Sequence, residues 1–271
     1  MGFFLLVSIF ARAHTLVISD IDDTIRASHS AAGFDHLIRL MDTRNSFAGA
    51  SELYRQLQVE RPGIQFMYIS GGPQFLRSRY KAFLNNSGFP EGLLILKNNP
   101  LESSKNYKYR EIMEQLSKID GIEQVVLIGD NVQYDETIYK KVKIELAKRN
   151  IETHIFIHQV RSSKNVLSDQ TPFFTPFVLA LQLHDLGLVS HQGLGKIISF
   201  FDQELDGRSN EEILPDYMRQ SQYLSQEIRE ALLNRVPEFL IEPARDVLDR
   251  LSKLKNTVHC RRVLHQPSDS Y

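Results

Sequence analysis

The sequence predicts an α/β fold in which a parallel β-sheet lies between two layers of helices. Up to about residue 160, short apolar runs alternate with amphipathic stretches, the pattern of a doubly wound sheet with right-handed crossovers. The runs have little polar alternation, as expected for parallel strands that are buried on both faces. Apolar residues make up 42% of the 271-residue chain, which is enough for a substantial core.

Five strands are expected, each from a short and mainly apolar run. They cover residues 14–19, 64–70, 92–97, 123–129 and 152–158. Helices are expected between them, over residues 48–58, 73–88, 106–118 and 135–150. The first, third and fourth of these carry apolar residues near positions i, i+3, i+4 and i+7, and the second ends at Gly88 like a helix C-cap.

The pattern changes after about residue 170. Residues 171–188, 195–205, 223–236 and 244–255 look helical, with proline and glycine between them and no convincing strand. We therefore expect a core over residues 14–165 and a helical C-terminal extension over residues 166–271. The extension would either cap the sheet or form a small separate bundle.

The N-terminal apolar run predicts a signal peptide over residues 1–13. It ends in Ala11-Arg12-Ala13, the small-x-small form of a signal-peptidase site, although no basic segment precedes it. Cleavage would leave His14 first, in a secreted or periplasmic protein. The alternative is a buried edge strand in a cytoplasmic protein. The run is too short to span a bilayer, so no transmembrane segment is expected.

Charge and cysteine content exclude several classes of protein. The net charge is −1, with 32 basic and 33 acidic residues, so no global field favours nucleic acid as a partner. The single cysteine, Cys260, excludes an intramolecular disulfide and a cysteine-based metal site.

Acidic and anion-binding residues cluster after the predicted strands. The carboxyl ends of parallel strands meet at one edge of the sheet, where α/β proteins bind their ligands. The residues are Asp20, Asp22 and Asp23 after the first strand, Ser70, Gly71 and Gly72 after the second, Lys105 and Lys108 before the fourth, and Asp130 and Asp135 after it.

These residue types together favour phosphoryl transfer. Asp20, Asp22 and Asp130 would repel one another around one pocket, and a hard divalent cation such as Mg²⁺ would neutralise them. Ser70, the N–H groups of the glycines and a lysine are anion-binding groups. Transfer through an aspartyl-phosphate requires a metal, an anion cradle and an exposed carboxylate nucleophile. The alternative is a loop that binds Ca²⁺ or faces water, with no catalysis.

Four segments resemble the four motifs of the haloacid dehalogenase (HAD) phosphatase superfamily: "DIDDTI", Ser70 after an apolar strand, a downstream lysine and "IGDNVQYD". Over about residues 15–160 the chain is more closely similar to the catalytic domain of the actin-patch type of phosphatidate phosphatase. The blocks "ISDIDDTI", "YISGGP", "FLNNSGFPEGLLIL" and "LIGDNVQYDETIY" carry this likeness. The resemblance implies a HAD-type three-layer core. Residues 26–50, between the first two motifs, are short on regular structure and would provide only a small cap.

The resemblance also implies roles for the residues at the motif positions. Asp20 corresponds to the nucleophile, and Asp22 to the general acid that later acts as a base. The implied phosphate-binding residues are Ser70, Gly71 and Lys108, with Lys105 as the alternative to Lys108.

A metal site follows from the same resemblance, with Mg²⁺ as the expected ion. Its implied ligands are the carboxylates of Asp20 and Asp130, the backbone carbonyl of Asp22, and Asp135 as a ligand or as an acceptor for metal-bound water. Asp23 and Thr24 are expected to hold the loop in place by hydrogen bonds to backbone.

Two departures from the family pattern bear on the substrate. Where the family has a serine run followed by Pro-Trp, this chain has Ser70-Gly71-Gly72-Pro73-Gln74, and it contains no tryptophan. The usual "GDSGE" is "GDNVQ" here, although the spacing to Asp135 is kept. The missing ring weakens the case for a lipid substrate more than the case for phosphoryl chemistry.

The expected function is Mg²⁺-dependent hydrolysis of phosphate monoesters, with phosphatidate or a related lipid phosphate as the leading substrate. A small cap would leave the site open to a membrane-resident substrate. One alternative is a broad-specificity periplasmic acid phosphatase that acts on soluble phosphate esters. A second alternative is a non-catalytic module that binds a phosphorylated ligand.

Overall fold

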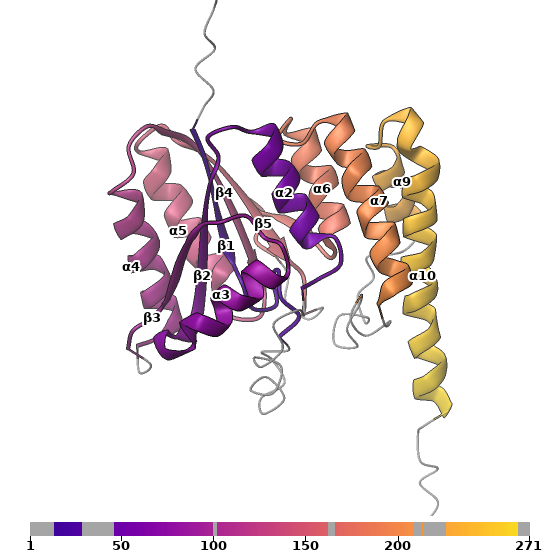
Figure 1. Cartoon of the computed structure of the whole chain (residues 1–271), viewed down its shortest axis with the longest axis horizontal. Helices are drawn as coiled ribbons and strands as arrows, with labels where there is room; N and C mark the ends of the chain where they lie inside the picture. The colour runs from indigo at the N-terminus through magenta and orange to yellow at the C-terminus, as the bar shows by residue number, and fades with distance from the viewer. Residues whose placement is uncertain are drawn as a thin grey trace, which may run out of the picture.

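A six-stranded, all-parallel sheet forms the centre of the computed structural model (Figure 1). The structure describes residues 14–28, 46–99, 102–161, 166–208, 213 and 226–264. The strand order is β3-β2-β1-β4-β5-β6. The chain therefore places β2 and β3 on one side of β1, and β4, β5 and β6 on the other. The strands are β1 (His14–Asp20), β2 (Gln65–Pro73), β3 (Leu93–Lys97), β4 (Ile122–Asp130), β5 (Glu152–His158) and β6 (Thr171–Phe173).

The predicted alternation of strands and helices up to residue 160 is confirmed. The helices are α2 (Ala50–Glu60), α3 (Arg77–Asn86) after the 3₁₀ turn η2 (Gln74–Leu76), α4 (Ser104–Leu116) and α5 (Asp135–Ala147). Gly88 lies just beyond α3 with a φ of 77°, which is the left-handed conformation expected of a C-cap glycine. Ser103 caps α4 by accepting a hydrogen bond from the N–H of Asn106.

The sheet separates two apolar cores. Successive residues of β1 face opposite sides, so Val17 packs into one core while Leu16 and Ile18 pack into the other. The second core is completed by α4 and α5, through residues such as Ile112 and Val142. Both faces of the sheet are therefore covered, as predicted for a three-layer fold.

The expectation that no strand follows residue 170 is wrong. Residues Thr171–Phe173 form β6, in which Pro172 pairs in register with Ile157 of β5. A three-residue strand with a central proline has no sequence signature, and proline is tolerated here because β6 is an edge strand. The rest of this region is helical: α6 (Pro176–Asp185), α7 (His191–Gly207), α9 (Gln226–Leu233), the turn η3 (Glu238–Leu240) and α10 (Ile241–Leu264).

The C-terminal helices extend the core of the sheet. One continuous apolar cluster joins Val17 of β1 and Leu53 of α2 to Phe177 of α6, Phe201 of α7 and Val247 of α10. In Figure 1, α2, α6, α7 and α10 stand side by side on one side of the sheet. The C-terminal helices therefore share the apolar core that lies on one face of the sheet.

Several expectations concern segments that lie outside the described residues. These are the signal peptide over residues 1–13 and most of the small cap, residues 29–45. Within the part of the chain that is described, no helix has the length and apolar character needed to cross a bilayer.

Candidate active site

The predicted site residues meet at the carboxyl edge of the sheet, around the point where β1 lies beside β4. Asp20 is the last residue of β1 and Asp130 the last residue of β4. These adjacent parallel strands, paired at Ser19 and Ile128, bring together two carboxylates that are 110 positions apart in the chain. Asp135 joins them as the first residue of α5.

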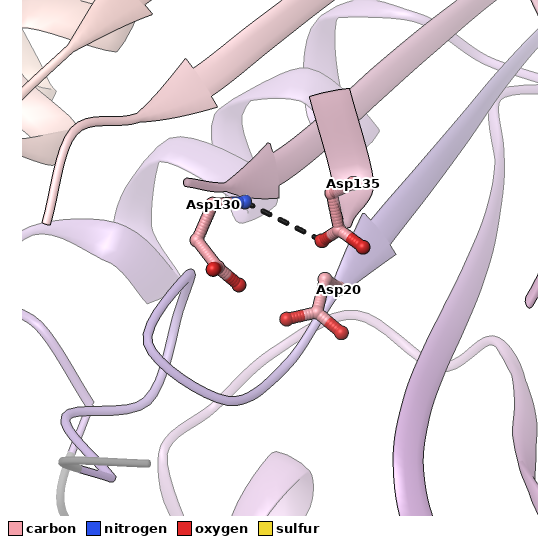
Figure 2. Close-up of side chains that lie close together, drawn as sticks. All are labelled: Asp20, Asp130 and Asp135. Atoms are coloured by element: carbon pink, nitrogen blue, oxygen red, sulfur yellow. Dashed lines mark hydrogen bonds between the residues drawn. The ribbon is translucent and has the colours of Figure 1, made fainter. Parts of the chain in front are cut away.

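Three buried carboxylates form a cluster at this point (Figure 2). Asp20, Asp130 and Asp135 each offer an oxygen, and these oxygens lie within 4.8 Å of one another. The Thr24 hydroxyl contacts both Asp20 Oδ2 (3.3 Å) and Asp130 Oδ2 (3.4 Å), so these two oxygens face a common point. Close approach of Asp135 depends on Gly129, because a Cβ there would lie 2.6 Å from Asp135 Oδ2.

Two members of this cluster, Asp20 and Asp130, are costly to ionise without a bound metal ion. Burial, followed by the charges of Asp135 and Asp20, raises the pKa of Asp130 well above its usual range. Burial also raises the pKa of Asp20 to about 7, against the opposing effect of Lys108. Three hard oxygen donors in one buried cluster fit a divalent cation, which would relieve this repulsion.

Lys108 supplies the positive charge of the site. Its Nζ lies 2.6 Å from Asp20 Oδ1 and 2.7 Å from Asp135 Oδ1. Burial lowers the pKa of Lys108, but Asp135 and Asp20 more than offset this effect and raise it above its usual value. The alternative lysine, Lys105, lies elsewhere, with its Nζ 5.8 Å from the ring centroid of Tyr134. Lys108 is therefore the lysine that the fold brings to the carboxylates.

Asp22 lies apart from the carboxylate cluster and is held by two hydroxyl groups. Its Oδ2 accepts hydrogen bonds from Ser70 Oγ at 2.8 Å and from Tyr80 Oη at 2.7 Å. Ser70 is itself fixed, because the N–H of Gly72 donates to its Oγ at 2.9 Å. Burial and then the charge of Asp22 raise the pKa of Tyr80 well above its usual range, so the phenol keeps its proton.

Sequence reasoning missed Tyr80, which it placed only as a residue of an amphipathic helix. The signal that could have found it is Gly72. A Cβ at position 72 would lie 2.3 Å from Tyr80 Oη, so glycine is needed for the phenol to reach the site. Gly72 stands where the family has a serine, and the space left by the missing side chain is filled by Tyr80 from α3.

His158 is a second residue that the sequence did not place at the site. It is buried at the end of β5, and its Nδ1 lies 2.7 Å from the carbonyl oxygen of Asp23. Asp23 has a φ of 60°, and its Oδ1 accepts a hydrogen bond from the N–H of Ser28 at 3.2 Å. The expectation that Asp23 positions the loop by bonding to backbone is confirmed, whereas Thr24 contacts carboxylates of the site instead.

The site opens into a cavity of about 150 Å³. Its wall is formed by Asp20, Asp22, Ser70, Gly71, Gly72, Pro73, Tyr80, Lys108, Asp130 and Gln133. A phosphate group fits a cavity of this size, but a sugar, nucleotide or lipid would extend out of it.

A three-layer α/β fold with acids, a lysine and a serine at the sheet reversal defines the class of a phosphatase with a Rossmann-like core. The family described as "Phosphatidate phosphatase APP1, catalytic domain" matches residues 15–159, more than half of the chain. The chain belongs to this family. It is therefore a phosphatase, and its substrate is a phosphate ester.

Comparison with other proteins adds weak structural likenesses. No curated protein matches the chain. A chain of the "Pnkp1/Rnl/Hen1 complex" is similar with a TM-score of 0.39 and 14% identity, over 53% of this chain and 46% of that one. The class C acid phosphatase from Bacillus anthracis, solved with tungstate bound, is similar with a TM-score of 0.36 and 16% identity, over 63% of this chain and 72% of that one. The protein thus spans less than half of the first of these chains.

Proposed function

We propose that this protein hydrolyses phosphate monoesters with Mg²⁺ through a phosphorylated Asp20, and that its substrate is phosphatidate or a related lipid phosphate. The arrangement around Asp20 supports the proposal most directly. One oxygen of Asp20 contacts Lys108, the other faces Asp130, and Asp22 lies on the wall of the same cavity.

The carboxylate cluster supports a metal ion. Asp20, Asp130 and Asp135 would hold Mg²⁺ through oxygen donors, and the backbone carbonyl of Asp22 is the further ligand expected from the sequence. When bound, the ion would neutralise the carboxylates and stabilise negative charge on the phosphoryl oxygens.

The side chains would divide the reaction between them. An Asp20 oxygen attacks phosphorus and forms an O–P bond, while the bond from phosphorus to the ester oxygen breaks. The ester oxygen keeps the electron pair and takes a proton from Asp22, so an alcohol leaves. Asp22, now a carboxylate, takes a proton from water, whose oxygen attacks phosphorus while the bond from phosphorus to the Asp20 oxygen breaks. Inorganic phosphate leaves and both carboxyl groups return to their starting states.

Lys108 and Ser70 would bind the phosphoryl group during both steps. An ammonium group has three N–H donors, and two of those on Lys108 are directed to Asp20 and Asp135. The third would be free for a phosphoryl oxygen. Ser70 and Gly71 line the same cavity, where a hydroxyl and backbone can bind the remaining oxygens.

Two exposed aromatic residues close in sequence to the cavity wall support a lipid phosphate as the substrate. Phe75 follows the cavity wall residue Pro73 by two positions and is 78% exposed. Tyr134 follows the wall residue Gln133 and is 50% exposed. Exposed aromatic residues this close in sequence to the wall of a phosphate-sized cavity suit a substrate whose headgroup enters while its chains stay in a membrane.

A substrate panel with and without Mg²⁺ and EDTA tests the proposal. Vesicle-embedded phosphatidate should turn over faster than p-nitrophenyl phosphate or nucleoside monophosphates, and EDTA should abolish the activity. Asp20→Asn should remove turnover without unfolding the protein. Faster turnover of the soluble esters would instead identify a broad-specificity phosphatase, the alternative that the missing tryptophan favours.

A further inference from the structure

We propose that Tyr80 is a positioning residue that holds the carboxyl group of Asp22 in the orientation in which it serves the leaving group. The proposal rests on the proposed function, in which Asp22 is the general acid. It goes beyond that function by giving a role to a side chain from α3 that lies outside the recognised motifs.

The hydrogen bonds to Asp22 are unequal between its two oxygens. Ser70 Oγ and Tyr80 Oη both donate to Oδ2, at 2.8 and 2.7 Å. Oδ1 is buried and has no hydrogen-bond partner among the described residues. Two donors on the same oxygen fix the rotation of the Asp22 carboxyl group, so the hydroxyl groups of Ser70 and Tyr80 set its orientation.

Of the two donors to Asp22, Tyr80 is the one that is not also expected to bind the phosphoryl group. Ser70 also contacts Tyr80 Oη at 3.1 Å, accepts from the N–H of Gly72 and is expected to bind the phosphoryl group. When Ser70 turns to the substrate, Tyr80 alone keeps Oδ2 occupied. The Arg26 guanidinium lies 5.7 Å from the centroid of the Tyr80 ring and 5.1 Å from that of Phe83, which fixes the ring further.

Gly72 and Tyr80 form a matched pair. A Cβ at position 72 would lie 2.3 Å from Tyr80 Oη and 2.8 Å from its Cζ. The phenol hydroxyl thus occupies the volume that a side chain at position 72 would need. The hydroxyl that faces Asp22 comes from α3, and the absence of a side chain at position 72 makes room for it.

The role can be tested by varying the leaving group. During attack by Asp20, the bond between phosphorus and the ester oxygen breaks, and that oxygen takes its proton from Asp22. An alkoxide needs this proton, whereas p-nitrophenolate leaves readily without it. Tyr80→Phe should therefore lower kcat/KM for soluble dioctanoyl phosphatidate by about tenfold or more, while kcat/KM for p-nitrophenyl phosphate changes less than about threefold.

Tyr68→Phe is the matched control. Tyr68 is also buried, but its hydroxyl donates to the carbonyl oxygen of Pro90 and not to Asp22. This variant should leave the ratio of the two kcat/KM values unchanged. Equal losses for both substrates in Tyr80→Phe, or no loss for the alkyl ester, would overturn the positioning role.

A rescue experiment uses the matched pair. Gly72→Ala should reproduce the selective loss seen in Tyr80→Phe, because the new Cβ displaces the phenol. Tyr80→Leu combined with Gly72→Ser removes the ring and returns a hydroxyl near Asp22, and it should recover part of the activity on the alkyl ester relative to Tyr80→Leu alone. Absence of any recovery would count against the proposal.

Asp22→Asn separates failure of this inference from failure of the proposed function. If Asp22→Asn loses the alkyl ester selectively but Tyr80→Phe behaves like the unaltered protein, only the positioning role is wrong. If Asp22→Asn shows no such selectivity, Asp22 is not the acid and the proposed mechanism fails with the inference.

Discussion

The ammonium group of Lys108 lies 2.6 Å from a carboxylate oxygen of Asp20, and both side chains are only 3% exposed. This contact joins the second turn of α4 to the end of β1. A buried charge pair is strongly destabilised when one partner is removed, because the other charge is left unpaired in a medium of low polarity.

Replacement of Lys108 by methionine should therefore abolish turnover and lower the free energy of unfolding by about 3 kcal/mol or more. Urea denaturation followed by circular dichroism measures the stability. Lys105→Met removes a partly exposed lysine outside the carboxylate cluster and should change the stability by less than about 1 kcal/mol. Equal effects of the two variants would show that the buried contact does not stabilise the fold.

Asp130→Asn should stabilise the metal-free protein and weaken its binding of Mg²⁺. At about pH 8 without metal, this variant removes a carboxyl group whose pKa is raised in the fold, and with it the free-energy cost of either burying its charge or protonating it, so the melting temperature should rise above that of the unaltered protein. Added Mg²⁺ should stabilise the unaltered protein and leave Asp130→Asn nearly unchanged. Thermal unfolding with EDTA and with Mg²⁺ measures both effects, and the exposed Asp120→Asn is the control. A full Mg²⁺ shift in Asp130→Asn would place the metal elsewhere.

His158 should make the fold sensitive to acid. Burial lowers its pKa below the usual 6.5, so in the fold the ring stays neutral at a pH where the unfolded chain has taken up a proton. The unfolded state then binds more protons, and the free energy of unfolding falls as the pH drops below 6.5. The slope contributed by one group is at most about 1.4 kcal/mol per pH unit.

Replacement of His158 by glutamine should remove this slope, as measured by denaturant midpoints between about pH 7 and pH 5. His154 lies on the same strand but is partly exposed and pairs with Glu152, so His154→Gln should keep the slope. An unchanged slope in His158→Gln would assign the acid sensitivity to other groups.

Gly49→Ala tests how closely the C-terminal helices are joined to the sheet. Gly49 precedes α2 with a φ of 74°, and a Cβ there would lie 2.5 Å from Cδ2 of Phe201 in α7. Gly187 has a φ of 67° and no atom within 4 Å of such a Cβ, so Gly187→Ala measures the backbone cost alone, about 1 kcal/mol. Gly49→Ala should lower the free energy of unfolding by about 2 kcal/mol more than Gly187→Ala does. Similar values for the two would mean that α7 moves aside freely.

Most of the fold could be predicted from the sequence because local patterns and the sheet geometry agree. The apolar runs identify β1 to β5, and parallel pairing then dictates that Asp20 and Asp130 lie at one edge. The choice between Lys105 and Lys108 required the structure, because one turn of helix separates them and either could face the strand ends.

The remaining features depend on contacts that no local pattern encodes. Tyr80 and His158 look like ordinary core residues in the sequence, and their functional positions come from contacts with the loop after β1 that span 58 and 135 positions. The strand β6 is too short for alternation to be visible, and Pro172 argues against a strand unless its edge position is already known.

The family match stops at residue 159, yet the apolar cluster that begins in β1 continues through α6, α7 and α10 to Leu251. The segment that matches the family is thus shorter than the segment that shares one apolar core. A fragment cut at the family boundary would leave the outer face of α2 uncovered, including Leu53 and Leu57, and would aggregate in water. In this chain, the segment that the family shares is therefore not expected to be stable without the helices that follow it.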